Sequence, residues 1–142
     1  MPRKITIVSR KYKYHEKFEY VCLSKERFFG YKKEGNIIIA QKEKAFIDSL
    51  LFPKYSGGIR EISRMLQANI VHLDVDLLTK YALKVKSKMV PRRLGFLLQD
   101  VLSLKNKQRL LRHIGKGVGF LDPNMTQRKD LNKEWLLYTR IE

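Results

Sequence analysis

The stretch DVDLLTKYALKVKSKMVPRRLGFLLQDVL, residues 74–102, decides the fold class of this chain. Its first half has an apolar stripe with the spacing of an α-helix, formed by Leu78, Tyr81, Ala82 and Val85. Asp74 is a natural N-cap for this helix. Pro91 favours the first position of a following helix, because proline fixes φ and lacks the N–H that a helix interior needs. We expect that second helix to bury Leu94, Leu97, Leu98, Val101 and Leu102.

Helical spacing continues on both sides of this stretch, so the helical region is expected to cover residues 41–115. Before it, one helix would bury Phe46, Ile47, Leu50 and Leu51 and end at Pro53. The next would bury Ile59, Ile62, Met65 and Leu66. After it, a short helix closed by Gly115 would bury Leu110, Leu111 and Ile114. The sequence therefore predicts four to five consecutive helices.

The two ends of the chain have the composition of strands. Ile, Val, Tyr and Phe are enriched in residues 4–9, 18–23, 28–31 and 36–40, which predicts a small N-terminal antiparallel sheet. In the extended segment 116–142, one side of a terminal strand would be formed by Trp135, Leu137, Thr139 and Ile141. This strand is a candidate partner for the N-terminal sheet. Strands, consecutive helices and a final strand make an α+β pattern, and we expect a single domain over residues 1–142.

The composition narrows the class of protein. The chain has 142 residues, with 30 Lys and Arg against 14 Asp and Glu, a formal net charge of +16, and 44% hydrophobic residues. This apolar fraction argues against a disordered basic tail, and the single Cys22 argues against a disulfide framework. No apolar run is long enough for a membrane helix, and no signal-peptide pattern opens the chain. We expect a cytoplasmic protein whose charge attracts a polyanion or an acidic protein, unless the charge serves solubility alone.

Two basic runs are candidate binding surfaces. The first interleaves Arg10, Lys11 and Lys13 with tyrosines, a combination that can contact phosphates and stack on bases. The second contains no acidic residue and consists of Lys80, Lys84, Lys86, Lys88, Arg92 and Arg93. An anion opposite Lys80 and Lys84, which share a helix face, would relieve their repulsion. We predict that these residues bind nucleic acid or a partner protein, chiefly through the second run. A solvated face with counterions is the alternative.

Residues suited to catalysis or metal binding are sparse. The histidines lie far apart, at His15, His72 and His113. Glu43 and Asp48 stand five positions apart, on different faces of their expected helix. The glycine-rich segment 115–119 lacks the Ser or Thr after its lysine and the following helix that a phosphate-binding loop requires. We therefore predict no catalytic residue, no metal site and no cofactor.

Three short strings then occur in order along the chain. The first expected helix opens with Glu43, Lys44, Ala45 and Asp48. The fourth opens with Arg92, Arg93, Leu94 and Gly95. The C-terminal segment contains Leu121, Asp122, Pro123, Asn132 and Trp135. With these strings, from about Ile5 to Ile141, the chain resembles the C-terminal domain of the AbiEi-type antitoxin family of abortive-infection, type IV toxin and antitoxin systems.

The resemblance implies a noncatalytic regulatory protein. Members of this family typically join an N-terminal winged-helix DNA-binding domain to this α+β domain, repress their own operon and counteract a nucleotidyltransferase-like toxin. This chain has no helix-turn-helix pattern before Gln41, so a separate winged-helix protein is a candidate partner besides DNA and the toxin. One alternative is a stand-alone DNA- or RNA-binding protein. Another is a Mg²⁺-dependent nuclease or nucleotidyltransferase that uses Glu43, Asp48 or Asp122.

The same strings also have structural interpretations. Lys44 would pair with Asp48 on the exposed side of its helix, a contribution of about 0.3–0.5 kcal/mol. Gly95 inside a helix costs about 1 kcal/mol relative to alanine, which favours a close approach of another backbone there. Arg92 and Arg93 would clamp a carboxylate such as that of Asp122 through bidentate hydrogen bonds.

Overall fold

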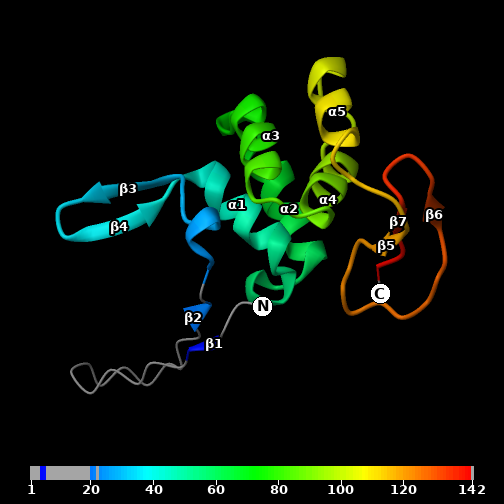
Figure 1. The fold of residues 1–142 in the computed structure, drawn as a ribbon, viewed down its shortest axis with the longest axis horizontal. Helices are drawn as coiled ribbons and strands as arrows, with labels where there is room; N and C mark the ends of the chain where they lie inside the picture. The colour runs from blue at the N-terminus through cyan, green and yellow to red at the C-terminus, as the bar shows by residue number, and fades with distance from the viewer. Residues whose placement is uncertain (1–3, 6–19, 22, 142) are drawn as a thin grey trace.

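The computed structural model describes residues 4–5, 20–21 and 23–141. Within these residues the α-helices are α1 (Lys42–Leu51), α2 (Ile59–Asn69), α3 (Val75–Lys84), α4 (Met89–Leu97) and α5 (Leu104–Leu111). The strands are β1 (Lys4–Ile5), β2 (Tyr20–Val21), β3 (Tyr31–Glu34), β4 (Ile37–Ala40), β5 (Gly119–Phe120), β6 (Leu131–Asn132) and β7 (Leu137–Tyr138). Three 3₁₀ helices are η1 (Lys25–Arg27), η2 (Pro53–Ser56) and η3 (Ile70–His72). The α+β class is confirmed (Figure 1). No helix among the described residues is long and apolar enough to cross a bilayer.

The N-terminal strands form two separate antiparallel pairs in the described part of the chain. β1 pairs with β2, and β3 pairs with β4, so the single small sheet predicted from the sequence is wrong. The strand expected over residues 28–31 lies instead at β3, because Gly30 adopts a left-handed φ of +71° that interrupts the extended chain. Residues 6–9, 18–19 and 22 of the other predicted strands lie outside the described residues.

The helices follow the predicted apolar stripes closely. Asp74 caps α3, because its side chain accepts a 3.0 Å hydrogen bond from the Leu77 amide. The stripe of α3 is buried as predicted, at Leu78, Tyr81, Ala82 and Val85. α4 begins at Met89 rather than at Pro91, and α5 begins at Leu104, capped by Ser103. Two residues expected in the core are exposed, Met65 and Val101, because α2 packs a narrower stripe and Val101 lies beyond the end of α4.

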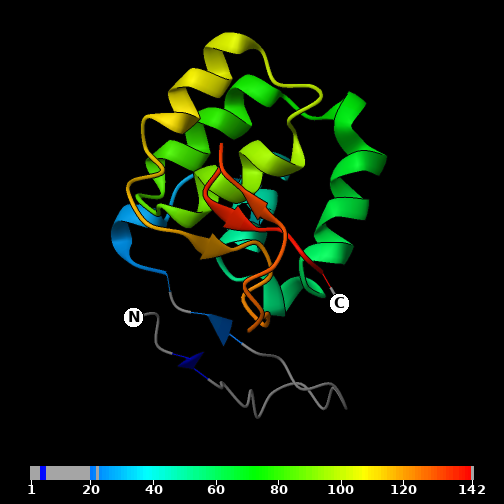
Figure 2. The same ribbon diagram turned by 90° about the vertical axis from the view of Figure 1, so that its right-hand side faces the viewer.

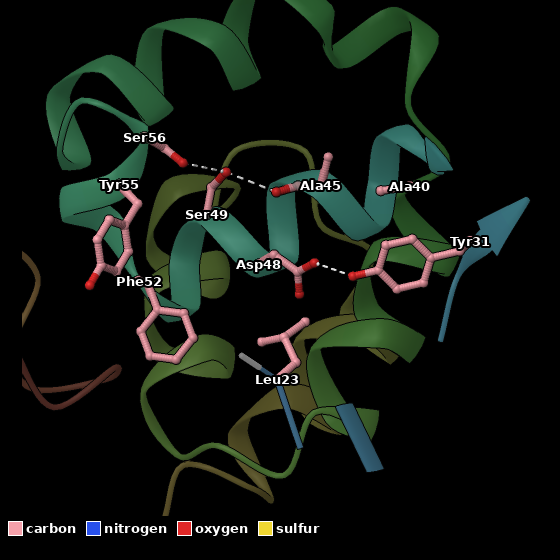
Figure 3. A pocket seen from close by; sticks show the side chains of 9 residues that line it. All are labelled: Leu23, Tyr31, Ala40, Ala45, Asp48, Ser49, Phe52, Tyr55 and Ser56. Carbon is pink, nitrogen blue, oxygen red and sulfur yellow. Dashed lines mark hydrogen bonds between the residues drawn. The ribbon is translucent and has the colours of Figure 1, made fainter. Parts of the chain in front are cut away.

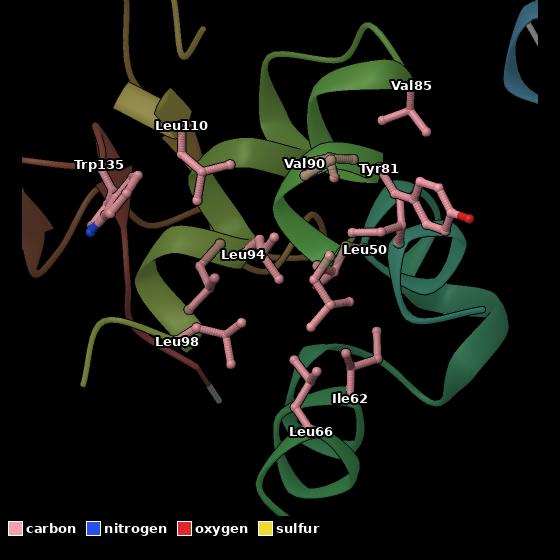
Figure 4. Close-up of a cluster of buried hydrophobic side chains, with 14 of the residues drawn as sticks. Leu50, Ile62, Leu66, Tyr81, Val85, Val90, Leu94, Leu98, Leu110 and Trp135 are labelled. Atoms are coloured by element: carbon pink, nitrogen blue, oxygen red, sulfur yellow. The ribbon is translucent and has the colours of Figure 1, made fainter. Parts of the chain in front are cut away.

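One hydrophobic cluster connects the helices with the C-terminal segment. It runs along the chain from Ile47 to Leu137, and its centre is fully buried (Figure 4). Residues without any exposed surface include Ile47, Leu50, Leu78, Leu94, Leu110 and Leu137. Buried aliphatic side chains from all five helices therefore supply much of the favourable burial energy of the fold.

The C-terminal segment forms its own small sheet. The strand order is β5-β7-β6, with β5 parallel and β6 antiparallel to β7. Among the described residues β7 therefore does not pair with the N-terminal strands, and that expectation is wrong. The long terminal strand predicted over Trp135, Leu137, Thr139 and Ile141 is shorter than expected, because Leu136 has a left-handed φ of +54°. Figure 2 shows these strands in front of the helices.

The contact between α4 and the C-terminal segment depends on Gly95. The Trp135 indole, which is 1% exposed, occupies the space that a Cβ at position 95 would fill. A side chain, and not the backbone expected from the sequence, thus makes the close approach to this glycine. An ion pair between Lys107 of α5 and Glu134 also connects this segment to the helices.

Candidate functional site

Four of the predicted basic residues lie together along the chain at the end of α3 and in the turn that follows. Lys80, Lys84, Lys86 and Lys88 are all exposed. We call these four residues the lysine surface. No Asp or Glu occurs between positions 77 and 99, so this part of the chain supplies no acidic neighbour along the sequence.

The backbone around the lysine surface is sharply turned. α3 ends at Lys84, and Lys86 adopts a left-handed φ of +54°, an unfavourable conformation for a residue with a Cβ. Lys86 directly follows the C-cap Val85, a position where helices commonly end with a left-handed residue. Here the turn leaves Lys86 and Lys88 exposed on either side of Ser87, whose hydroxyl accepts hydrogen bonds from the amides that open α4.

The contacts of these lysines leave their charge largely uncompensated. Lys86 Nζ lies 3.4 Å from Glu26 Oε2, but both side chains are 71% exposed, so water and salt screen the pair. Lys84 Nζ lies 4.4 Å from the centre of the Phe29 ring, a cation–π contact that keeps the charge. The aliphatic part of Lys88 lies beside Gly115. Packing contacts thus involve Lys84 and Lys88, and the lysine surface keeps its positive charge.

Arg92 belongs to the protein interior and not to this surface. It is 4% exposed, and its guanidinium donates to the Ile114 carbonyl from Nε at 3.0 Å and from Nη2 at 2.5 Å. A third hydrogen bond, of 3.4 Å, reaches the Lys116 carbonyl. Burial lowers the pKa of Arg92 below its ordinary value. The side chain closes the turn after α5, where orphan carbonyls need donors.

Arg93 has the same kind of role on the other side of α4. It is 6% exposed and donates to the carbonyls of Leu121 at 3.1 Å and Leu50 at 2.8 Å. Burial lowers the pKa of Arg93 to about 10, although the negative charge of Asp122 acts in the opposite direction. One cation thus joins the end of α1 to the strand segment of β5.

These positions correct two sequence predictions. Arg92 and Arg93 cannot present their guanidinium groups to a ligand, because backbone carbonyls already bind them inside the protein. The bidentate clamp on Asp122 is also wrong, because the acceptors are carbonyl oxygens and Asp122 Oδ1 accepts from the Asn124 amide at 2.9 Å. Three further predicted residues, Arg10, Lys11 and Lys13, lie outside the described residues.

The ion pair predicted between Lys44 and Asp48 is present, but it lies in a buried position beside Phe29 and Tyr31. Lys44 has no exposed surface, and its ammonium bonds to Asp48 rather than lying on the exposed side of α1 as predicted. It also stands 4.6 Å from the centre of the Phe29 ring. Tyr31 donates a 3.1 Å hydrogen bond to Asp48 Oδ2. Helical spacing could have revealed this, because Lys44 shares a face with Ile47 and Leu51.

A small open pocket adjoins this pair. It has a volume of about 350 Å³ and is lined by Leu23, Tyr31, Ala40, Ala45, Asp48, Ser49, Phe52, Tyr55 and Ser56 (Figure 3). Three of its hydroxyl donors are used within the protein: Tyr31 donates to Asp48, Ser49 to the Ala45 carbonyl and Ser56 to Ser49 Oγ.

The three carboxylates considered as ligands for Mg²⁺, those of Glu43, Asp48 and Asp122, each bind a different partner within the protein. Glu43 accepts from the Asp74 amide at 3.0 Å and so ties α1 to the start of α3. Asp48 binds Lys44 and Tyr31, and Asp122 forms a local turn with Asn124. Within the described residues no three His, Cys, Asp or Glu side chains gather in a way that could hold a metal ion.

Fold and surface together define an α+β protein with an exposed basic segment at the end of α3. No family model, no curated protein and no solved structure matches this chain. The function therefore has to be argued from the chain's own residues.

Proposed function

We propose that this protein is a noncatalytic, antitoxin-like regulatory module that binds nucleic acid through the lysine surface. The observation that carries the proposal is the exposure of all four lysines in a stretch without acidic residues. Lysine ammonium groups on such a surface can bind the phosphates of a nucleic-acid backbone. These contacts do not depend on the base sequence. A net charge of +16 adds a long-range attraction to the same polyanion.

The chemistry of the site supports binding rather than discrimination between bases. The arginines that could have formed bidentate contacts with guanine are used for backbone carbonyls. Lysines alone act as point charges. We therefore infer that affinity depends mainly on the number of phosphates contacted and that sequence specificity, where needed, comes from a separate winged-helix partner.

The proposal is tested by the salt dependence of binding to a fluorescent duplex of about 20 base pairs and to a single strand of equal length. Each phosphate contact contributes about 0.9 to the slope of log K against log salt for duplex DNA. Replacing the four lysines by glutamine should flatten the slope by up to about 3.6 and weaken binding at low salt at least tenfold. A matched set of exposed lysines provides the control: Lys54, Lys105, Lys129 and Lys133.

The control set removes the same charge from other segments and should change the slope by less than about 1. Equal effects of the two sets would show that net charge alone attracts nucleic acid and would remove the lysine surface from the proposal. No binding of the unmodified protein at about 50 mM salt would overturn it entirely.

The antitoxin part of the proposal rests on the resemblance of the three sequence strings. It requires that co-expression relieve the growth inhibition of a nucleotidyltransferase-like toxin encoded beside this protein. Failure of relief with intact nucleic-acid binding would favour the stand-alone nucleic-acid-binding alternative. Nuclease-treated pull-down of the toxin distinguishes direct contact with the toxin from tethering by nucleic acid.

A further inference from the structure

The β3–β4 hairpin exposes an unusual amount of apolar surface. Ile37, Ile38 and Ile39 follow one another in β4 and are 64%, 61% and 39% exposed. Figure 1 shows the hairpin extending away from the helices, where the rest of the described chain does not cover it. Isolated exposed apolar residues are ordinary, but a contiguous apolar strand on a projecting ribbon is typical of an interaction surface.

The pairing of the hairpin is also incomplete. In the described part of the chain β3 and β4 pair only with each other, so each strand has an unpaired edge. A two-stranded ribbon is marginally stable in water, and three or more strands are usually needed. An additional strand would therefore both satisfy backbone groups and cover isoleucine.

The two edges differ in charge. β3 carries Lys32, Lys33 and Glu34, whereas β4 has the sequence Ile-Ile-Ile-Ala. Lysines on an edge strand discourage the addition of another strand, and β4 has no such protection. The free edge of β4 is thus the one suited to pairing.

We propose that β4 pairs antiparallel with β4 of a second copy of this chain, about a two-fold axis at Ile38. This register places Ile38 opposite Ile38 of the other copy, and Ile37 opposite Ile39. The three pairs formed by Ile37, Ile38 and Ile39 are then all apolar and β-branched, a favourable combination. The strand is complementary to itself, as a symmetric dimer interface requires.

The position of the charges favours this arrangement over the others. The equivalent pairing through β3, about Lys33, would place Lys33 opposite Lys33 of the other copy. Pairing through β4 gives the order β3-β4-β4-β3, which separates the two β3 strands by about 14 Å, more than the Debye length of about 8 Å at physiological ionic strength. Because each copy carries a net charge of +16, salt should strengthen the association, whereas it weakens nucleic-acid binding.

The first test is sedimentation velocity of the full chain between about 5 and 500 μM protein, at about 50 and 500 mM NaCl. The expected mass rises from 16.8 kDa toward twice that value, more readily at the higher salt. Ile38→Lys should raise the dissociation constant at least about tenfold, because like charges would then face each other across the axis. Val71→Lys, at a residue 83% exposed in η3, is the matched control and should have no effect.

A cross-linking experiment tests the register itself. With Cys22 replaced by alanine, Ile38→Cys should form a disulfide-linked dimer on mild oxidation, because directly opposed residues have Cα atoms about 4.5–5.5 Å apart. Ile37→Cys should not, because its own counterpart lies roughly 8 Å away. Equal cross-linking at both positions would overturn the register.

A chain that remains monomeric at the highest concentration and salt would overturn the proposal, as would equal effects of Ile38→Lys and Val71→Lys. A monomer whose hairpin binds a different protein would also overturn it. The glutamine variant of the lysine surface, which leaves β4 unchanged, should still dimerise. Loss of nucleic-acid binding and loss of self-association are therefore separate results.

Discussion

At the scale of single residues, Tyr31 shows how the buried ion pair acts on its neighbours. Burial raises the pKa of the Tyr31 phenol to about 12, assisted by the negative charge of Asp48 and by the hydrogen bond that Tyr31 donates to it. A phenolate would lose the hydrogen bond and face a carboxylate. The neutral form is therefore part of the structure that connects β3 to α1.

Tyr31 should consequently lose its proton at a higher pH in the folded protein than in the unfolded chain. Between pH 10 and pH 12 the unfolded chain loses this proton, because an ordinary tyrosine has a pKa of about 10, whereas the folded protein retains it. Its contribution to stability should be complete below pH 10 and disappear as the pH rises toward 12. NMR of the ring carbons should show a midpoint near pH 12 that is absent in Tyr31→Phe. A midpoint near 10 for Tyr31 would contradict the hydrogen-bonded geometry.

At the scale of elements, predictions based on residues a few positions apart were correct more often than predictions about which distant segments pair. The cap at Asp74 and the stripe of α3 were visible because they involve residues a few positions apart. The partners of Arg93 were not, because its acceptors include the carbonyl of Leu50, 43 positions away along the chain. The C-terminal sheet likewise depends on the left-handed backbone conformation of Leu136, which the pattern of apolar and polar residues does not predict.

The candidate site was predicted in part for the same reason. A run of basic residues can be recognised in a sequence. Whether their side chains are exposed to solvent depends on tertiary contacts, which the sequence does not give. The four lysines are exposed, whereas Arg92 and Arg93, on the next helix, are buried among carbonyl groups. The difference has a physical basis, since arginine offers a planar fork of donors that can satisfy several carbonyls, and lysine does not.

The packing of α4 against the C-terminal segment makes Gly95→Ala informative. In an ordinary helix interior this change would stabilise the protein by up to about 1 kcal/mol. Here the new methyl group would overlap the Trp135 indole, so we expect a net loss of about 1–3 kcal/mol in the free energy of unfolding.

Urea denaturation measures this change, and a double-mutant cycle with Trp135→Leu provides the control. In that background Gly95→Ala should cost much less, because the smaller side chain leaves room for the methyl group. A stabilising effect of Gly95→Ala in the unmodified protein would show that the indole does not occupy this space.

At the scale of the whole molecule, the positive charge opposes folding while it favours binding. A chain with 30 basic and 14 acidic side chains repels itself in the compact state, and the lysine surface concentrates part of that repulsion in one short segment. Counterions at high salt reduce it. An anionic ligand would reduce it more specifically, so binding and stability should be coupled.

This coupling predicts that the glutamine variant of the lysine surface is more stable than the unmodified protein at low salt. We expect a gain of about 0.5–1 kcal/mol in the free energy of unfolding at about 20 mM NaCl, and no gain at about 1 M, because salt already screens the repulsion there. The control set defined above removes equal charge from separate segments and should give a smaller gain. Urea titrations at both salt concentrations measure the difference. A loss of stability at low salt would mean that these lysines contribute more through the contacts with Glu26 and Phe29 than they lose by mutual repulsion.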